Sequence, residues 1–170
     1  DLRNLMYTGY AAFDGPFVIR YPRGKGEMKD WRNEMQVLPI GKGKKLRDGD
    51  DIAVLSIGPI GNEVIKAIEM VKEERVSIAH YDMIYLKPLD EELLHEIGQK
   101  YNRIITVENG VIKGGFGSAV LEFMADNGYT PHVKRIGVPD AFIEHGSIPE
   151  LYQLCGMDAE SIAKQLKKEN

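Results

Sequence analysis

Two arginines in the stretch "PFVIRYPRG" have the side chains best suited to bind a charged ligand. The stretch begins with a short β-branched run, which predicts a strand and a turn ending at Pro22. Arg20 and Arg23 flank that turn, at the kind of strand end where the ligands of parallel sheets gather. Guanidinium groups offer forked donors that match the oxygens of a phosphate. The pattern is equally typical of two solvated arginines, so the residues alone leave both interpretations open.

A glycine cluster follows an acidic residue in "VENGVIKGGFGSAV", residues 107–120. Glycine-rich turns at helix starts can hold phosphates. A dinucleotide site, however, needs G-x-G-x-x-G directly after a strand, with an acidic residue about 20 residues further on. Here the spacing is G-G-x-G, Glu108 precedes the cluster, and the Gly-Lys-Ser/Thr ending of a Walker loop is absent. The pattern therefore favours a structural turn that starts a helix against the sheet, rather than a nucleotide site.

The remaining reactive side chains show no spacing typical of a metal or catalytic site. The histidines are far apart in the chain, with no i, i+4 pair: His80, His95, His132 and His145. In "PDAFIEHG", Glu144 and His145 could reach into a cleft, but an ordinary loop is the favoured interpretation. Cys155 has no base near it in the sequence, which favours a small buried side chain over a nucleophile.

Composition excludes several classes of protein. The 170 residues are 43% hydrophobic and 28% charged, which is typical of a soluble domain. The net charge of −4 gives no general attraction to nucleic acid or anionic membranes, and the lysines of residues 42–45 are too few for a nucleic-acid patch. No apolar run is long enough to cross a membrane. The single cysteine fits a reducing cytoplasm, and the start at Asp1 suggests a fragment.

Strands and helices alternate after residue 36. A helix is expected over residues 2–12, and the polar residues 24–35 predict a linker or exposed loop. The expected strands are 42–47, with a tight turn at Asp48-Gly49, and then 51–58, 76–82, 103–108 and 132–137. The expected inward side chains of the next two helices are Val64, Ile65, Ile68, Val71, Leu93, Leu94, Ile97 and Tyr101. The expected first residues or N-caps of helices are Pro88, Asp90, Ser147 and Asp158. Such βαβ units predict an α/β fold, a three-layer α/β/α sandwich with a mostly parallel five-stranded sheet.

An ordered set of motifs resembles one enzyme family. The motifs are "YTGY…DGPFVIRYPRG", "LPIGKGKKLRDGDDIAVLSIG", "LKPLD", "ITVENGVIKGGFGSAV" and "GVPDAFIEHG". Together they resemble the C-terminal end of bacterial 1-deoxy-D-xylulose-5-phosphate synthases over essentially all 170 residues. The nearest rivals are transketolases and the β subunits of 2-oxoacid dehydrogenases, which lack "RYPRG" followed by "GKG". The resemblance implies that residues 1–35 end a pyrimidine-binding domain and residues 36–170 form a transketolase-type C-terminal domain.

The resemblance also implies a reaction. The family condenses pyruvate with glyceraldehyde 3-phosphate, with loss of CO₂, to 1-deoxy-D-xylulose 5-phosphate for isoprenoid, thiamine and pyridoxal synthesis. It acts as a cytoplasmic homodimer with thiamine diphosphate and Mg²⁺. The family's catalytic, cofactor and metal residues all lie upstream of Asp1, so we expect no cofactor on this chain and no activity from it alone. Only Arg23 and Arg20 carry over, as contacts to the substrate phosphate, with Arg23 favoured as the main one.

The sequence departs from the family's pattern at two positions, and two other identities for the chain stay open. Ile84 stands where many relatives have arginine, and Asn109 replaces a frequent second acid, which puts contacts between domains in doubt more than catalysis. The chain could instead end another thiamine diphosphate enzyme, such as a transketolase or a 2-oxoacid dehydrogenase β subunit. It could also be a free-standing α/β module that binds a nucleotide.

Overall fold

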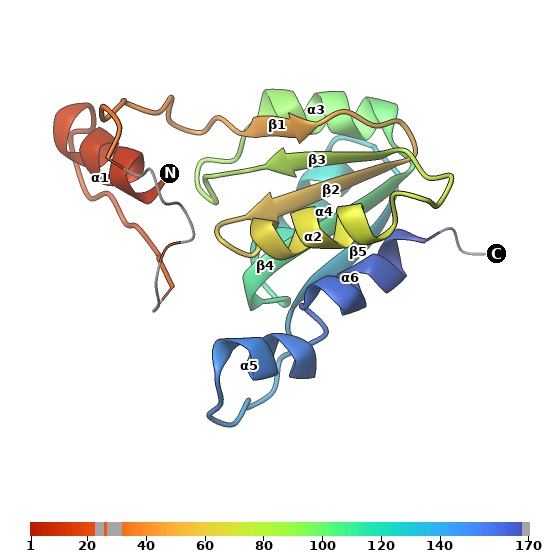
Figure 1. Ribbon diagram of the computed structural model, residues 1–170. Coiled ribbons are helices and arrows are strands. Elements are labelled where there is room, and N and C mark those ends of the chain that lie inside the picture. The colour runs from red at the N-terminus through yellow and green to blue at the C-terminus, as the bar shows by residue number, and fades with distance from the viewer. Residues whose placement is uncertain (23–25, 27–31, 168–170) are drawn as a thin grey trace.

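The computed structural model describes residues 1–22, 26 and 32–167, and its centre is one five-stranded sheet (Figure 1). The strands are β1 (Lys44–Arg47), β2 (Ile52–Ile57), β3 (Ile78–Asp82), β4 (Arg103–Val111) and β5 (His132–Val138). Their order in the sheet is β1-β3-β2-β4-β5. The four strands from β3 to β5 run parallel, and β1 pairs antiparallel with β3 at the edge. This confirms the predicted, mostly parallel five-stranded sheet.

Helices cover both faces of the sheet and make three layers (Figure 1). The helices that pack against it are α2 (Gly61–Met70), α3 (Glu91–Lys100), α4 (Phe116–Asp126) and α6 (Ala159–Leu166). One core cluster joins the sheet to α2 and α6, and a second joins its other face to α3 and α4. The short α5 (Ile148–Leu154) has no buried residue. In the described ranges no helix is long and apolar enough to span a membrane.

Burial explains why these segments form strands and helices. All of β2 except its last residue is buried, because both faces of a central parallel strand are covered by helices. On α2, Val64 and Ile68 pack into the core with Ala67 between them. The prediction that Ile65 also points inward is wrong, since its side chain is 52% exposed. The other three residues expected to face inward, Val64, Ile68 and Val71, are buried, so the apolar stripe is narrower by one position than predicted.

Side-chain caps begin three of the helices as predicted. The carboxylate of Asp90 accepts a hydrogen bond from Leu93 N at the start of α3, and Asp158 accepts one from Ser161 N at the start of α6. Ser147 and Glu150 form a reciprocal capping box at the start of α5. Within each cap the two partners are close neighbours in the chain, so the sequence alone is enough to predict it.

The turn at Asp48-Gly49 does not make a hairpin, because β1 pairs with β3 rather than with β2. Gly49 lies directly against the backbone at the start of β3, where a Cβ would be 2.2 Å from Ile78 C. Its carbonyl oxygen accepts hydrogen bonds from Tyr101 Oη at 2.7 Å and Lys100 Nζ at 2.9 Å. After this turn the chain therefore passes the start of β3 and enters the sheet as β2, on the opposite side of β3 from β1.

The expected strand in "PFVIRYPRG" is also wrong for the described residues, since none of 16–22 has strand structure. Prolines bound this stretch at 16 and 22, and each removes a backbone donor that a sheet partner would need. The segment is held by side chains instead. The ring of Phe17 contacts Phe13 at 5.4 Å and Tyr85, just past β3, at 6.4 Å between centroids.

Helix α1 (Leu2–Ala11) forms a small N-terminal lobe beside the sheet (Figure 1). Its one buried residue is Thr8, whose hydroxyl donates to Asn4 O at 2.7 Å and accepts from Leu38 N at 2.8 Å. Gln36 N also donates to Asn4 Oδ1. The helix is thus attached mainly to the chain around residues 36–38, while its apolar side chains Met6 and Tyr10 stay 61% and 89% exposed.

We propose that the domain boundary lies near residue 36, and this leads to a prediction about truncation. Residues 36–170 should fold alone as one cooperative unit, because both core clusters lie wholly within them. Deleting residues 1–35 should cost about 1–2 kcal/mol, since Leu38 loses cover and its amide loses the Thr8 acceptor. Thermal unfolding followed by circular dichroism should show a single sharp transition, and a broad or absent transition would contradict the boundary.

Candidate functional site

The carboxyl ends of β2 and β4 form the edge of the sheet where a ligand site is expected. The chain leaves β2 for β3 on one side and later returns to β4 on the other, so the strand order reverses between these two strands. In open α/β sheets, ligands bind at such a reversal, beyond the carboxyl ends of the strands. The arrowheads of β2 and β3 point towards the N-terminal lobe, which faces this edge (Figure 1).

The glycine turn after β4 is closed by a carboxylate of the chain itself. Glu108 is 5% exposed, and its two oxygens accept 2.8 Å hydrogen bonds from the backbone amides of Phe116 and Gly117 at the start of α4. Without this carboxylate, the two amides would lack an acceptor, and together with the helix dipole they would attract an anion such as a phosphate. The position suited to an anion is therefore filled, and the prediction of a structural turn is confirmed.

The turn needs glycine because its neighbours leave no room for side chains. A Cβ at Gly115 would lie 2.3 Å from Glu108 Oε2, and one at Gly117 would lie 2.5 Å from Thr106 Oγ1. The guanidinium of Arg135 on β5 donates 2.8 Å hydrogen bonds to Ile112 O within the turn and to the hydroxyl of Ser118 on α4. The turn is thus held between Glu108 on one side and Arg135 on the other.

A buried polar pair lies between β2 and β3 near the same edge. Ser56 Oγ is 2.8 Å from His80 Nε2, and both residues are 1% exposed. Burial lowers the pKa of His80 to about 4, because a charged imidazolium would lose its hydration there. Gly61 at the start of α2 lies over the pair, where a Cβ would be 2.9 Å from Ser56 Oγ. Neutral His80 thus serves as a packed hydrogen-bonding partner within the core.

Of the two predicted phosphate ligands, one can be described. Arg23 lies outside the described residues. Arg20 is exposed. On α5, burial raises the pKa of the Tyr152 phenol and the Glu63 carboxylate raises it further, while the positive charge of Arg20 opposes them. Tyr152 Oη accepts a 3.2 Å hydrogen bond from Asn109 Nδ2 on β4. No pattern in the sequence predicts this contact, because Tyr152 lies 43 residues from Asn109 along the chain.

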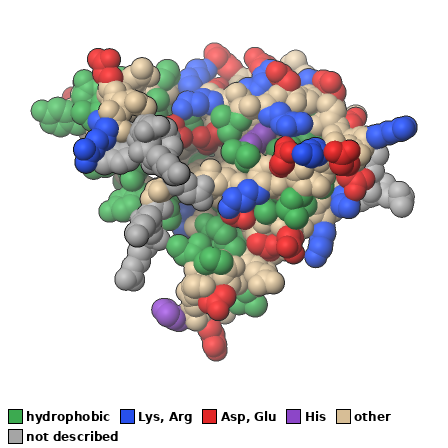
Figure 2. Space-filling model, viewed as in Figure 1, with side chains coloured by type: hydrophobic (Ala, Val, Ile, Leu, Met, Phe, Trp, Pro, Cys, Tyr) green, Lys and Arg blue, Asp and Glu red, His purple; other side chains and the backbone are tan. Residues whose placement is uncertain are grey.

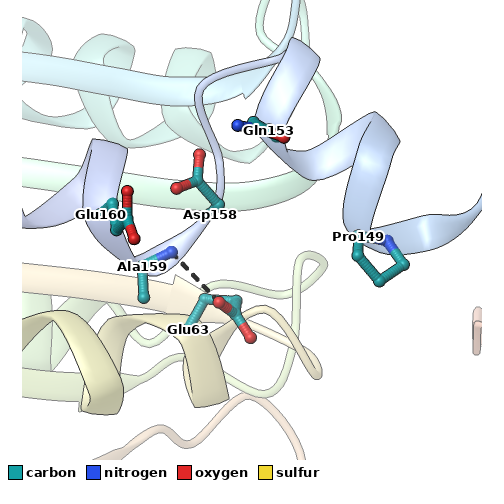
Figure 3. A pocket seen from close by; sticks show the side chains of 6 residues that line it. All are labelled: Glu63, Pro149, Gln153, Asp158, Ala159 and Glu160. Atoms are coloured by element: carbon teal, nitrogen blue, oxygen red, sulfur yellow. Dashed lines mark hydrogen bonds between the residues drawn. The ribbon is translucent and has the colours of Figure 1, made fainter.

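A hollow of about 320 Å³ lies between the starts of α2 and α6 and helix α5 (Figure 3). Three of its six lining side chains are carboxylates: Glu63, Asp158 and Glu160. Glu63 is fixed by accepting from Ala159 N at 3.1 Å and by an ion pair with Lys66 at 2.6 Å. So much negative charge makes the hollow unsuited to a phosphate.

The other reactive residues lie apart from one another. His95 contacts the rings of Phe123 and Tyr129 on the face that α3 and α4 cover, whereas His132 and His145 are exposed. Cys155 is partly buried against the core cluster of α2 and α6, as expected. Within residues 1–22, 26 and 32–167, no group of three or more His, Cys, Asp or Glu could hold a metal ion.

Comparison with known proteins gives a family match over most of the chain. A family described as "Transketolase, C-terminal domain" matches residues 41–162. A 1-deoxy-D-xylulose-5-phosphate synthase from Bacteroides thetaiotaomicron is 59% identical over 170 residues, 99% of this chain and 26% of the relative. One from Porphyromonas gingivalis is 60% identical over 162 residues, 95% of this chain and again 26% of the relative. The chain thus spans about a quarter of the length of these relatives.

Solved structures agree with this match. A structure described as "Split gene transketolase, inactive beta4 tetramer" is 30% identical, with a TM-score of 0.69 over 78% of this chain and 45% of its own. A transketolase from Campylobacter jejuni is 12% identical, with a TM-score of 0.55 over 74% of this chain and 18% of its own. At that identity the second likeness concerns the fold alone.

The closed glycine turn predicts that Glu108 is a major source of stability. Glu108→Ala leaves two backbone amides at a buried helix start without an acceptor, and should lower the free energy of unfolding by about 3 kcal/mol. Glu122→Ala, on the exposed side of the same helix, is the control and should change it by less than about 0.5 kcal/mol. Urea denaturation measures both, and equal effects would contradict the role of Glu108.

The buried His80 predicts a loss of stability in acid. An unfolded histidine has a pKa near 6.5 and the folded His80 one of about 4, so the unfolded state binds the proton first as the pH falls. Its contribution is fully present above pH 6.5 and is lost between 6.5 and 4, by about 2–3 kcal/mol from pH 7.5 to 4.5. Urea denaturation should show a flatter pH dependence for His80→Gln and an unchanged one for exposed His132→Gln. A His80→Gln profile as steep as the parent's would refute it.

Proposed function

Because the chain belongs to the transketolase C-terminal domain family, we propose that it is the C-terminal part of a 1-deoxy-D-xylulose-5-phosphate synthase. The observation that carries the proposal is the extent of the similarity. Relatives with that name are 59% identical over 170 residues, whereas the domain family begins only at residue 41. The similarity thus extends over the lobe and the "RYPRG" segment, and "RYPRG" followed by "GKG" is the feature that the related enzyme families lack.

The proposed reaction of the whole protein condenses pyruvate with glyceraldehyde 3-phosphate and releases CO₂. Thiamine diphosphate, when bound, supplies a carbanion equivalent for this chemistry. The described residues do not fit that cofactor or its Mg²⁺: they contain no suitable metal cluster, and the start of α4 is filled by Glu108. Since the chain spans only 26% of its relative's length, we propose that the rest of the protein binds the cofactor, activates pyruvate and releases CO₂.

The proposed contribution of this chain is that Arg23 and Arg20 bind the substrate phosphate. A phosphate monoester is a dianion, and a forked charged donor orients it through two parallel hydrogen bonds. Phe17, whose ring meets Tyr85 edge to face, attaches the segment that carries Arg20 just past the end of β3. Fixing the phosphate there would leave the aldehyde at the other end of the substrate free to meet the carbanion.

The apolar surface of the N-terminal lobe supports the proposal of further partners. Figure 2 shows hydrophobic side chains gathered over α1. The large exposed ones in and after this helix are Leu2, Met6, Tyr10, Phe13, Val18 and Tyr21. Exposed apolar side chains that gather in one place are typical of a surface that a partner covers. We infer that the upstream domains of the same protein cover it, in a homodimer.

The chain alone is expected to be inactive. A 30% identical structure is described as an inactive tetramer of β chains, in keeping with this expectation. We predict that the purified 170-residue chain neither binds thiamine diphosphate in the presence of Mg²⁺ nor consumes pyruvate. Isothermal titration calorimetry and a pyruvate assay measure the two, and cofactor binding at low micromolar affinity would refute the prediction.

The arginines give a test in the full-length protein. Arg23→Ala should raise the KM for glyceraldehyde 3-phosphate and leave the KM for pyruvate nearly unchanged, because only the first substrate carries a phosphate. The expected loss of kcat/KM is roughly ten- to a hundredfold. Arg20→Ala should show the same asymmetry if it shares the contact.

Lysine substitutions provide the matched control. Arg23→Lys should recover only part of the loss, since an ammonium keeps the charge but not the fork. Steady-state kinetics with each substrate varied in turn measure all three variants. Equal effects on both substrates would mean that the arginines are structural.

A further inference from the structure

A strained turn follows β3 and determines where the side chain of Tyr85 lies. Ile84 has a φ of 55°, although β-branched residues rarely adopt this left-handed region. Tyr85 N donates a hydrogen bond to Met83 O across Ile84, so the chain makes a three-residue turn here. The Asp82 carboxylate accepts a 3.2 Å hydrogen bond from Ile84 N and holds the turn. Strain of this kind persists only where the surrounding structure maintains it, and it is concentrated at functional sites.

The turn brings the ring of Tyr85 against Phe17 of the N-terminal segment. The two rings meet edge to face, at 6.4 Å between centroids and 85° between planes. Phe17 is also packed from the side of the lobe. A Cβ at Gly9 on α1 would lie 2.8 Å from its ring, and the ring of Phe13 is 5.4 Å away. Phe17 is therefore held between the lobe and the sheet domain.

Apolar packing has to orient the segment that contains Phe17. In the described part of the chain, no hydrogen bond or ion pair joins residues 13–22 to residues 36–167. The pair of Phe17 and Tyr85 is the aromatic contact between the two. Arg20 is three residues from Phe17, at most roughly 10 Å along an extended chain. A displacement of the Phe17 ring would therefore displace the guanidinium of Arg20 as well.

The contact is made by the ring of Tyr85 and does not involve its hydroxyl. Tyr85 is 7% exposed, and its Oη has no hydrogen-bond partner within the described ranges. Burial raises the pKa of this phenol, so it stays uncharged near neutral pH. A buried hydroxyl without a partner lowers stability instead of adding to it. The ring and the hydroxyl can therefore be tested separately.

We propose that Tyr85 is a positioning residue for the substrate phosphate, because its ring sets where Phe17 and the segment carrying Arg20 lie on the domain. The inference rests on the proposed function for the ligand of Arg20 and Arg23. It adds that the sheet domain controls the affinity for that ligand through a ring contact, without touching the ligand itself. The strained turn at Ile84 serves to place this ring.

The first test is kinetic and uses the full-length protein that contains this chain. Tyr85→Ala removes the ring and should raise the KM for glyceraldehyde 3-phosphate about tenfold, because the arginines lose their fixed position. The KM for pyruvate should stay within about twofold of the parent's value, since that substrate carries no phosphate. Tyr85→Phe keeps the ring and should leave both KM values unchanged.

Phe17→Ala tests the same contact from the exposed segment, where the substitution does not disturb the core of the sheet domain. It should raise the KM for glyceraldehyde 3-phosphate as Tyr85→Ala does. The double variant should raise it no further, because both substitutions remove one contact. Additive effects of Phe17→Ala and Tyr85→Ala would overturn the proposal.

Tyr129→Ala is the matched control. It removes a partly buried tyrosine ring that packs on the core cluster of α3 and α4, away from the lobe. It should lower the midpoint of thermal unfolding without raising the KM for glyceraldehyde 3-phosphate. An equal rise of this KM in Tyr129→Ala and Tyr85→Ala would mean that lost stability alone explains the effect, and the positioning role would be refuted.

A fluorine label gives a readout that does not depend on activity. With para-fluorophenylalanine in place of Phe17, the fluorine resonance should shift in Tyr85→Ala, because the label loses its edge-to-face neighbour. It should stay near the parent's position in Tyr85→Phe and in Tyr129→Ala. An unchanged resonance in Tyr85→Ala would show that the ring does not position the segment.

The outcomes separate this inference from the function on which it rests. If Arg20→Ala or Arg23→Ala raises the KM for glyceraldehyde 3-phosphate and Tyr85→Ala does not, the positioning role is refuted and the proposed function stands. If Tyr85→Phe raises this KM as much as Tyr85→Ala, the hydroxyl acts and positioning by the ring is refuted. If the full-length protein does not join pyruvate to glyceraldehyde 3-phosphate, the proposed function fails, and the positioning role fails with it.

Discussion

The carboxylate of Glu108, bound to the first amides of α4, is the interaction on which the edge of this domain depends. It lies towards the end of β4, and it fixes the position of the start of α4, the helix that covers part of one face of the sheet. Every neighbour has to accommodate it. Gly115 and Gly137 lack side chains where a Cβ would come within 3.0 Å of Glu108 atoms. A charge placed where a helix dipole attracts anions is stabilised without any outside ligand.

Two adjacent residues at the end of β4 therefore make contacts to two different helices. Glu108 points towards α4 and closes the turn, whereas Asn109 reaches Tyr152 on α5. Side chains alternate between the faces of a strand, so neighbours in sequence serve opposite layers. An acid at position 109 would offer no donor to the phenol oxygen in its ionised form, and the amide does. The amide at this position thus has a direct physical consequence for the orientation of Tyr152.

The sequence was sufficient for features set by neighbours in the chain and insufficient for those set by distant ones. Strand burial and the caps Asp90, Ser147 and Asp158 depend on periodicity or on residues within one helical turn, so they were predicted. The side chain of Ile65 has the right type for the core, but it lies on the exposed side of α2. The pairing of Asn109 with Tyr152 spans 43 residues and leaves no periodic trace. Of the candidate site, the sequence therefore predicted only the arginines.

Closing the turn with an internal carboxylate also explains why the proposed phosphate contacts come from another segment. An α/β sheet of this topology offers its strongest anion position at the start of the helix after the reversal of strand order. Here Glu108 occupies that position, and a second anion beside it would be repelled. A phosphate has to be bound further out, by groups that reach the edge from elsewhere. The exposed Arg20 lies on such a segment, which the contact between Phe17 and Tyr85 attaches beside β3. In the proposed arrangement the sheet acts as a support, and the proposed phosphate ligand Arg20 lies on a segment attached beside it.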